Sequence, residues 1–169
     1  MISEDTITTF NQKLQKNNLT IFCAESITAG LLASSIASVS GASMVLKGSI
    51  VTYDEKVKTK ILGVSEEILK EHSAESQETT TAMCGGLKAL YPGVSIYVTV
   101  TGVASAPAPG SGYILNKKVG QVYVTVFYKN EFHEFPKLIK PEEGGNYTRN
   151  EIREKTVEFI FQKIEELIT

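Results

Sequence analysis

The sequence predicts an α/β fold with a mixed, mostly parallel sheet that has helices on both faces. Helical and strand-like segments alternate along most of the chain, which favours this class over folds that segregate helices and strands. Two β-rich segments, "VGQVYVTVFYKN" and "EFHEFPKLI", flank Lys129-Asn130 and indicate an antiparallel hairpin, so the sheet is expected to be mixed. The 169 residues show no repeat or linker, and 1–169 are expected to form a single domain.

Capping residues and apolar spacing predict the elements of the first part of the chain. The stretch "EDTITTFNQKLQKNN" has a cap region at Ser3 and apolar residues at helical spacing, so it is expected to be a helix. The run "LTIFCA" is typical of a short buried strand. Residues 27–39 fit a helix whose many Ala and Ser residues favour close packing, and residues 45–53 alternate as a strand does.

Glycine and capping signals separate the elements that follow. The stretch "DEKVKTKILGV" predicts a helix that ends at Gly63, and a short helix starts at Ser65. Residues 75–90 are expected to be helical although Gly85 and Gly86 each cost about 1 kcal/mol relative to Ala, and these glycines can allow close helix packing. A strand over 94–101, a loop "VASAPAPGSGYILNKK", the hairpin and a helix from about Thr148 complete the chain.

Charge and composition exclude several classes of protein. The formal net charge is −2 and no run of one sign occurs, so we expect neither a nucleic-acid partner nor binding to an anionic membrane. No signal peptide and no apolar stretch of roughly 20 residues is found, which predicts a cytoplasmic protein. Cys23 and Cys84 have neither a CxxC partner nor a nearby His, so they are expected to be buried reduced thiols and not metal ligands.

Three polar stretches follow predicted strands and are expected to meet at one edge of the sheet. They are "CAESITAG", "GSIVTYDEKVK" and "TGVASAPAPGSG". In open α/β sheets ligands bind beyond the carboxyl ends of the strands, at loops that lead into helices. The sequence therefore predicts a binding site formed by these three stretches.

Ser26 is a candidate nucleophile in the first of these stretches. Free N–H groups in the turn after it would suit an oxyanion or a phosphate, although Ser26 and Thr28 could equally serve as helix caps. Neither His72 nor His133 lies in a convincing position for a base. A lysine can replace histidine if burial lowers its pKa, and Lys56, Lys58 and Lys60 follow the second strand; each could also be a solvated helix residue.

Arg149 and Arg153 lie four residues apart at the start of the last helix and share one face. Two guanidinium groups there could bind a phosphate or a carboxylate. They could equally form ion pairs with surface Glu residues. The stretch "SAPAPGSG" matches neither a P-loop nor a dinucleotide-binding motif.

The motifs and their order resemble the CinA C-terminal domain family, which includes the nicotinamide mononucleotide deamidases. The stretches "AESITAG", "GAS", "YDEKVKTKILGV", "HSAES", "TGVASAPAPG", "KKVGQV" and "YTRNEIR" are similar to the family patterns A-E-S-C-T-G-G, G-S-S, Y-S-N-E-A-K-x-x-x-L-G-V, H-G-A-V-S, S/T-G-I-A-G-P-G-G, K-P-V-G-x-V and G-x-R-x-x-V-R. The resemblance covers nearly the whole chain. It implies a three-layer α/β/α sandwich that converts nicotinamide mononucleotide to nicotinate mononucleotide and ammonia without cofactor or metal.

The resemblance also implies roles for particular residues. Ser26 would be the nucleophile, Lys58 the base, and Tyr53 a group that orients or shares the proton. The implied substrate-binding residues are Thr28, Ser43, Thr101, Gly102, Arg149 and Arg153. A small-molecule nucleotide is then the expected partner, and self-association into a homo-oligomer is expected from the family.

Departures from the family pattern keep other functions open. Ile27 and Ala29 replace Cys and Gly, and the loop over 103–112 carries Ala and Pro where the family has glycines that allow close approach to a ligand. A relative that binds a nucleotide-like ligand without hydrolysing it is therefore a second hypothesis. An interaction or structural domain is a third.

Overall fold

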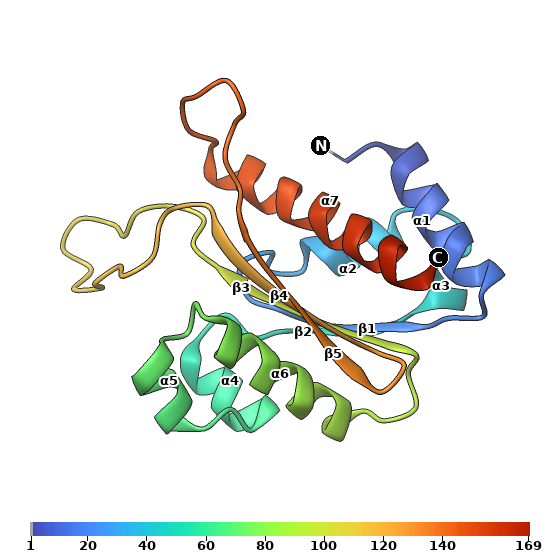
Figure 1. Cartoon of the computed structure of the whole chain (residues 1–169), viewed down its shortest axis with the longest axis horizontal. Helices are drawn as coiled ribbons and strands as arrows, with labels where there is room; N and C mark the ends of the chain where they lie inside the picture. The colour runs from blue at the N-terminus through green and yellow to red at the C-terminus, as the bar shows by residue number, and fades with distance from the viewer. Residues whose placement is uncertain (1) are drawn as a thin grey trace.

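A computed structural model describes residues 2–169, so Met1, the first residue of the predicted domain, lies outside the described part. Figure 1 shows three layers, with a central sheet between two groups of helices, as predicted. The five strands of the described residues are β1 (Ile21–Glu25), β2 (Leu46–Val51), β3 (Ile96–Gly102), β4 (Gln121–Tyr128) and β5 (Glu131–Leu138). The helices are α1 (Glu4–Lys16), α2 (Leu31–Ala37), α3 (Ala42–Val45), α4 (Glu55–Leu62), α5 (Glu66–His72), α6 (Gln77–Leu90) and α7 (Arg149–Ile168).

The sheet is mixed, which confirms the prediction. Its strand order is β2-β1-β3-β4-β5, with β1 parallel to both β2 and β3, while β4 is antiparallel to β3 and to β5. The hairpin turns at Lys129 and Asn130, both with positive φ, as a two-residue hairpin loop requires. Because β1 lies between two strands parallel to it, the turn after Glu25 opens at the carboxyl edge of these three strands.

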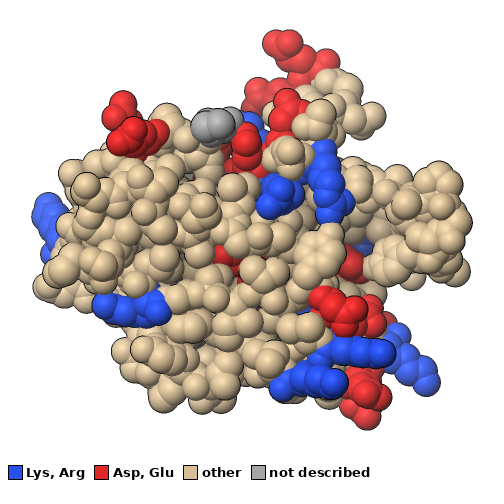
Figure 2. Space-filling model, turned by 180° about the vertical axis from the view of Figure 1, so that it is seen from behind, with Lys and Arg blue, Asp and Glu red and all other residues tan. Residues whose placement is uncertain are grey.

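Each face of the sheet is covered by its own helices. In Figure 1, α1, α2, α3 and α7 lie on one side, and α4, α5 and α6 lie on the other. One buried apolar cluster includes Phe10 of α1, which stacks on Phe161 of α7, and the other includes Leu62 of α4 with Met83 and Leu87 of α6. On the face seen in Figure 2, Lys and Arg lie near Asp and Glu rather than in one patch of a single sign.

Side chains cap several helices at the predicted positions. The hydroxyls of Ser3 and Ser65 accept hydrogen bonds from backbone N–H groups of α1 and α5. Thr148 and Glu151 form a capping box at the start of α7, and Gly63 ends α4 in a left-handed conformation. Local chemistry therefore determines where these elements begin or end.

Two predicted elements are shorter in the structure. The helix expected over 27–39 is α2, Leu31–Ala37, because Ala29 and Gly30 have positive φ values of 48° and 92° and form a turn. The strand expected over 45–53 is β2, Leu46–Val51, preceded by the short helix α3, which the sequence analysis did not predict. Left-handed residues cannot continue a right-handed helix, which accounts for the first difference.

Gly86 allows α4 and α6 to pack backbone to backbone. A Cβ atom at position 86 would lie 1.7 Å from the carbonyl oxygen of Leu62, the last residue of α4. The expectation of close packing is thus confirmed for Gly86. A Cβ atom at Gly85 would meet no atom within 4 Å, so close packing does not explain that glycine.

The two cysteines are buried and unpaired, as expected. Burial raises the pKa of the Cys84 thiol to about 12, and burial together with the nearby Glu25 raises the pKa of Cys23. Both thiols are therefore protonated and inert at neutral pH. Among the described residues, no helix is long and apolar enough to cross a bilayer.

Candidate active site

Ser26 and Lys58 are in direct contact at the carboxyl edge of the sheet. Ser26 follows the last residue of β1, and its backbone N–H donates to the carbonyl of Val100 on β3 at 3.0 Å. The ammonium or amine Nζ of Lys58 lies 3.1 Å from Ser26 Oγ. Lys58 exposes only 1% of its surface and Ser26 only 8%, so the amine is shielded from bulk water.

Backbone carbonyls hold the Lys58 side chain in place. Its Nζ donates to the carbonyl oxygens of Thr52 at 2.7 Å and Tyr53 at 3.3 Å, both at the end of β2. Asp54 caps α4, so Lys58 lies one turn into this helix. Lys58 and Leu62 share the buried side of α4, because residues four apart lie on one helix face. This places the amine beneath the strand ends.

The environment of Lys58 favours its neutral form. Burial lowers the pKa of Lys58 from its ordinary value, because desolvation disfavours the ammonium. The carboxylates of Glu75, Glu55 and Asp54 oppose this effect without cancelling it. A lysine with a lowered pKa can act as a general base towards a neighbouring hydroxyl.

The Glu25 side chain binds backbone N–H groups at the start of α2. Its buried carboxylate accepts hydrogen bonds from the N–H groups of Gly30, Leu32 and Ala33 at 2.9 to 3.0 Å, and from the Ser49 hydroxyl at 2.8 Å. The negative charge of Glu25 therefore already offsets the partial positive charge at the start of α2, and these N–H groups are not free to bind an oxyanion or a phosphate. This finding corrects the expectation of free N–H groups for Gly30, Leu32 and Ala33, but these bonds do not involve the N–H groups of Ile27 and Thr28 next to Ser26. The alternative prediction, that Ser26 and Thr28 cap the helix, is also wrong for α2. The N-cap residue of α2 is Gly30, and no side chain caps this helix.

Arg153 supports the turn after Ser26 instead of joining Arg149. One of its Nη atoms donates to the carbonyl of Thr28 at 2.8 Å, and the other donates to the Asn150 side chain at 3.0 Å. Arg149 lines the cavity described below and Arg153 does not, so the two guanidinium groups have different surroundings. Thr28 is fully buried, and its hydroxyl has no hydrogen-bond partner among the described residues.

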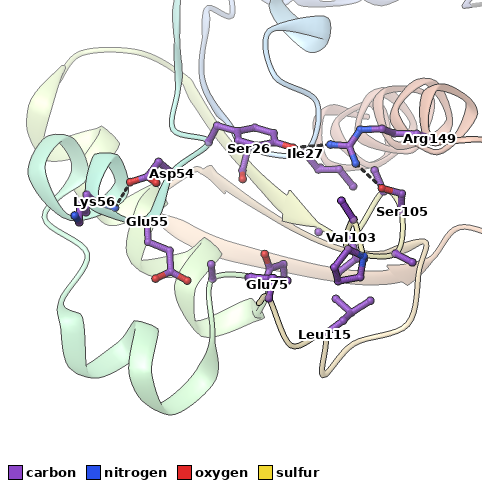
Figure 3. A pocket seen from close by; sticks show the side chains of 18 residues that line it. Ser26, Ile27, Asp54, Glu55, Lys56, Glu75, Val103, Ser105, Leu115 and Arg149 are labelled. Carbon is purple, nitrogen blue, oxygen red and sulfur yellow. Dashed lines mark hydrogen bonds between the residues drawn. The ribbon is translucent and has the colours of Figure 1, made fainter. Parts of the chain in front are cut away.

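A cavity of about 750 Å³ opens over the Ser26 hydroxyl. Figure 3 shows Ser26 on one side of it, Glu55 and Glu75 on another, and Arg149 near Ser105. The loop after β3 supplies much of the wall. The lining residues are Ser26, Ile27, Tyr53, Asp54, Glu55, Lys56, Ala74, Glu75, Gly102, Val103, Ala104, Ser105, Ala106, Pro107, Ala108, Tyr113, Leu115 and Arg149. No group of three or more His, Cys, Asp or Glu within residues 2–169 is placed to bind a metal ion.

Tyr53 and Arg149 meet at the rim of the cavity. Arg149 donates through its two Nη atoms to the hydroxyls of Ser105, at 2.7 Å, and Tyr53, at 2.5 Å. Tyr53 is 56% exposed, and its hydroxyl faces Arg149, while only its backbone carbonyl contacts Lys58. The geometry thus makes Tyr53 an orienting partner of Arg149. It does not place the Tyr53 hydroxyl on the amine.

The three other predicted site residues have different positions. Gly102 lines the cavity, and Thr101 is buried below it, where its hydroxyl donates to the carbonyl of Ala74 at 2.9 Å. Ser43 is exposed on α3, ahead of β2. The first residue of β2 pairs with Ile21, the first residue of β1, whereas Ser26 follows the last residue of β1. Ser43 is therefore at the opposite edge of the sheet from Ser26 and does not join this cavity within the chain.

The segment that carries Glu75 into the cavity contains a strained residue. Ser73 has φ 71° and ψ 167°, a region that glycine occupies almost exclusively. Its carbonyl accepts hydrogen bonds from the hydroxyls of Ser76 and Thr79, and the carbonyl of Ala74 accepts from Thr101. These bonds hold the strained backbone, and the family pattern H-G-A-V-S carries a signal for it, because Ser73 stands where that pattern has glycine.

Replacing Ser73 with glycine is expected to stabilise the protein. Ser73→Gly removes the strain of the Cβ atom and leaves the bonds to the Ser73 and Ala74 carbonyls intact, and it loses only the long 3.4 Å bond from the Ser73 hydroxyl to the Glu75 carbonyl. Unfolding should therefore cost about 1 kcal/mol more, and Tm should rise by about 2–4 °C. Differential scanning calorimetry measures the change. Ser73→Ala, which keeps the Cβ atom, should give no such gain. A Tm of Ser73→Gly at or below that of the wild type would contradict the strain.

Comparison with known proteins identifies the family. A family model described as the CinA C-terminal domain matches residues 3–168. A CinA-like protein of Prochlorococcus marinus is 38% identical over 146 residues, which cover 86% of this chain and 32% of that protein. The Protein MG115 homolog of Mycoplasma pneumoniae is 34% identical over 158 residues, which cover 94% of each chain. The chain thus spans about one third of the length of the Prochlorococcus relative and nearly all of the Mycoplasma one.

Solved structures share the fold. The competence/damage inducible protein CihA from Agrobacterium tumefaciens matches with a TM-score of 0.84 at 28% identity, covering 98% of this chain and 95% of that one. The competence damage-inducible protein A (ComA) from Klebsiella pneumoniae matches with a TM-score of 0.82 at 22% identity, covering 96% and 94%. The family model spans nearly every residue of the chain, and the sequence relatives agree with it. The chain therefore belongs to the CinA C-terminal domain family.

Proposed function

We propose that this protein is an amidohydrolase that converts nicotinamide mononucleotide and water to nicotinate mononucleotide and ammonia. The observation that carries the proposal is the 3.1 Å contact between Lys58 Nζ and Ser26 Oγ at the floor of a cavity. A buried lysine next to a hydroxyl is the arrangement that activates a serine in the absence of histidine. The family resemblance supplies the substrate.

Ser26 and Lys58 can perform both halves of the reaction. The neutral Lys58 amine takes the proton of Ser26, and Oγ attacks the carboxamide carbon. The resulting ammonium returns the proton to the amide nitrogen, so the C–N bond breaks and ammonia leaves an ester on Ser26. Water then attacks this ester with Lys58 again as base, and the acid product and the free hydroxyl form. Protons balance over the cycle, and water is the only reactant besides the nucleotide.

Arg149 is the side chain best placed to bind the substrate phosphate. Its guanidinium lines the cavity and donates to two hydroxyls, those of Tyr53 and Ser105, and it forms no salt bridge within residues 2–169. A phosphate can therefore pair with it without breaking an ion pair. Arg153 contributes indirectly, because it fixes the turn that presents Ser26.

Ammonia release tests the proposal directly. Purified protein incubated with nicotinamide mononucleotide should release ammonia and nicotinate mononucleotide in equal amounts, as measured by a coupled ammonia assay and by chromatography. The rate should scale with protein concentration. Calorimetric binding of the nucleotide with no ammonia released would instead favour the second candidate, a binding protein.

One observation favours that second candidate. Ala106, Pro107 and Ala108 line the cavity, and proline has no N–H with which to contact a ligand. The loop over 103–112 therefore offers fewer backbone donors than a glycine-rich loop would.

We also propose that the protein acts in the cytoplasm on a small molecule and self-associates, in line with the family.

A further inference from the structure

Glu75 places a negative charge in the cavity and forms no salt bridge there, although its charge also acts on the buried Lys58. Its side chain lines the cavity, and its Oε2 atom accepts a hydrogen bond from the Tyr113 hydroxyl at 2.7 Å. No salt bridge to Glu75 occurs among residues 2–169. A partly buried carboxylate without a counter-charge costs free energy, and a cation supplied by a ligand would compensate for that cost.

The position of Glu75 is held on two sides. Behind it, the carbonyls of Ser73 and Ala74 are fixed by hydroxyl groups of α6 and β3. In front of it, Tyr113 reaches across from the loop after β3, and burial together with Glu75 and Glu55 raises the pKa of Tyr113, so this phenol stays a neutral donor. The charge of Glu75 therefore has a defined place in the cavity.

Other charged groups surround the cavity unevenly. Asp54, Glu55 and Lys56 come from the start of α4, and Arg149 comes from the start of α7. Arg149 is bound to Tyr53 and Ser105 at the rim, whereas Figure 3 shows Glu55 and Glu75 in the lower part of the view, below Arg149. Arg149 therefore lies at one end of the cavity, and the other end carries three carboxylates, those of Asp54, Glu55 and Glu75, against the single ammonium of Lys56.

We propose that Glu75 determines substrate specificity by selecting a carboxamide whose ring carries a positive charge. The inference rests on the proposed function. In nicotinamide mononucleotide the carboxamide is bonded directly to a cationic pyridinium ring, and the phosphate lies at the other end of the molecule. With the carboxamide over Ser26 and the phosphate at Arg149, the ring lies inside the cavity, where Glu75 can attract its charge. The polarity of the cavity matches the polarity of that molecule.

Two nearly isosteric ligands isolate the ring charge. Nicotinamide mononucleotide has a cationic ring, and its reduced form has a neutral dihydropyridine with the same carboxamide, ribose and phosphate. Binding is measured by calorimetry in a Ser26→Ala background, so that no turnover interferes. We expect the cationic ligand to bind about 10- to 100-fold more tightly, which corresponds to one or two steps of 1.4 kcal/mol.

The variant Glu75→Gln keeps the shape of the side chain and removes its charge. Glu75→Gln should lower the preference for the cationic over the reduced ligand to about 3-fold or less. The affinity for the cationic ligand should fall, while the affinity for the reduced ligand stays nearly the same. Tyr113→Phe is the matched control. It removes the hydrogen bond but leaves the carboxylate, so it should keep most of the preference.

Each other outcome has a definite meaning. If Glu75→Gln keeps the preference for the cationic ligand, or loses the same factor of affinity for both ligands, the role of Glu75 is overturned and the proposed function still stands. Equal affinities for the two ligands in the Ser26→Ala background also overturn the role of Glu75 without contradicting the proposed function. Failure of the background protein to bind either ligand, together with no ammonia release by the wild type, overturns the proposed function and this inference with it.

Discussion

Ser26→Ala should reduce the hydrolysis of nicotinamide mononucleotide by at least about 10⁴-fold in kcat, while the affinity for the substrate stays within a few-fold of the wild type. The hydroxyl is small and lies at the floor of the cavity, so its removal takes away the nucleophile and leaves the walls in place. Initial rates of ammonia release give the loss of activity. Calorimetry gives the affinity.

The control for this variant is another serine close by in the chain. Ser34→Ala changes an exposed residue on α2, outside the lining of the cavity, and should leave the rate unchanged. Wild-type rates in Ser26→Ala would refute the nucleophilic role. Loss of substrate affinity with an unchanged kcat would make Ser26 a binding group instead.

Lys58→Met should lower kcat/KM by about 10²- to 10⁴-fold, the range that general base catalysis provides. Methionine fills a similar length of buried space but cannot accept the proton of Ser26. The exposed Lys60 on the same helix provides the matched control, because Lys60→Met makes the same substitution at a residue that does not line the cavity. Near-normal hydrolysis by Lys58→Met would exclude this lysine as the base.

The wild-type pH profile should report the same amine. Only neutral Lys58 can act as a base, so kcat/KM should rise with pH as the ammonium loses its proton. Burial lowers the pKa of Lys58, so this rise should occur below the usual range of lysine, although Glu75, Glu55 and Asp54 moderate the shift. A profile that rises only near pH 10.5, the ordinary lysine value, would contradict a desolvated base.

The boundaries of the elements could be predicted where one residue decides them. Ser65, Gly63 and Thr148 each supply a local hydrogen bond or a backbone conformation, and the structure confirms all three. The left-handed turn at Ala29 could not be predicted in this way, because alanine rarely adopts that conformation and only the surrounding contacts hold it there.

The site was harder to predict than the fold, because its contacts join residues far apart in the sequence. The resemblance indicated Ser26 and Lys58, and the structure brings them together although 32 positions separate them. Spacing could not show that Arg153 is bound to Thr28, since a shared helix face does not say what the face meets. Nor could it show that Glu25 binds the amides of α2, because a carboxylate next to a serine is common.

The missing side chain at Gly86 has a consequence for the chemistry. Helix α4, which carries the amine, rests directly on α6 at this glycine, and a single methyl group there would overlap the carbonyl of Leu62. To make room, α4 would have to shift and draw its lysine away from the hydroxyl. The contact between Lys58 and Ser26 thus depends on a position outside the cavity: a larger residue 86 would disturb that contact while every polar group that lines the cavity stayed the same.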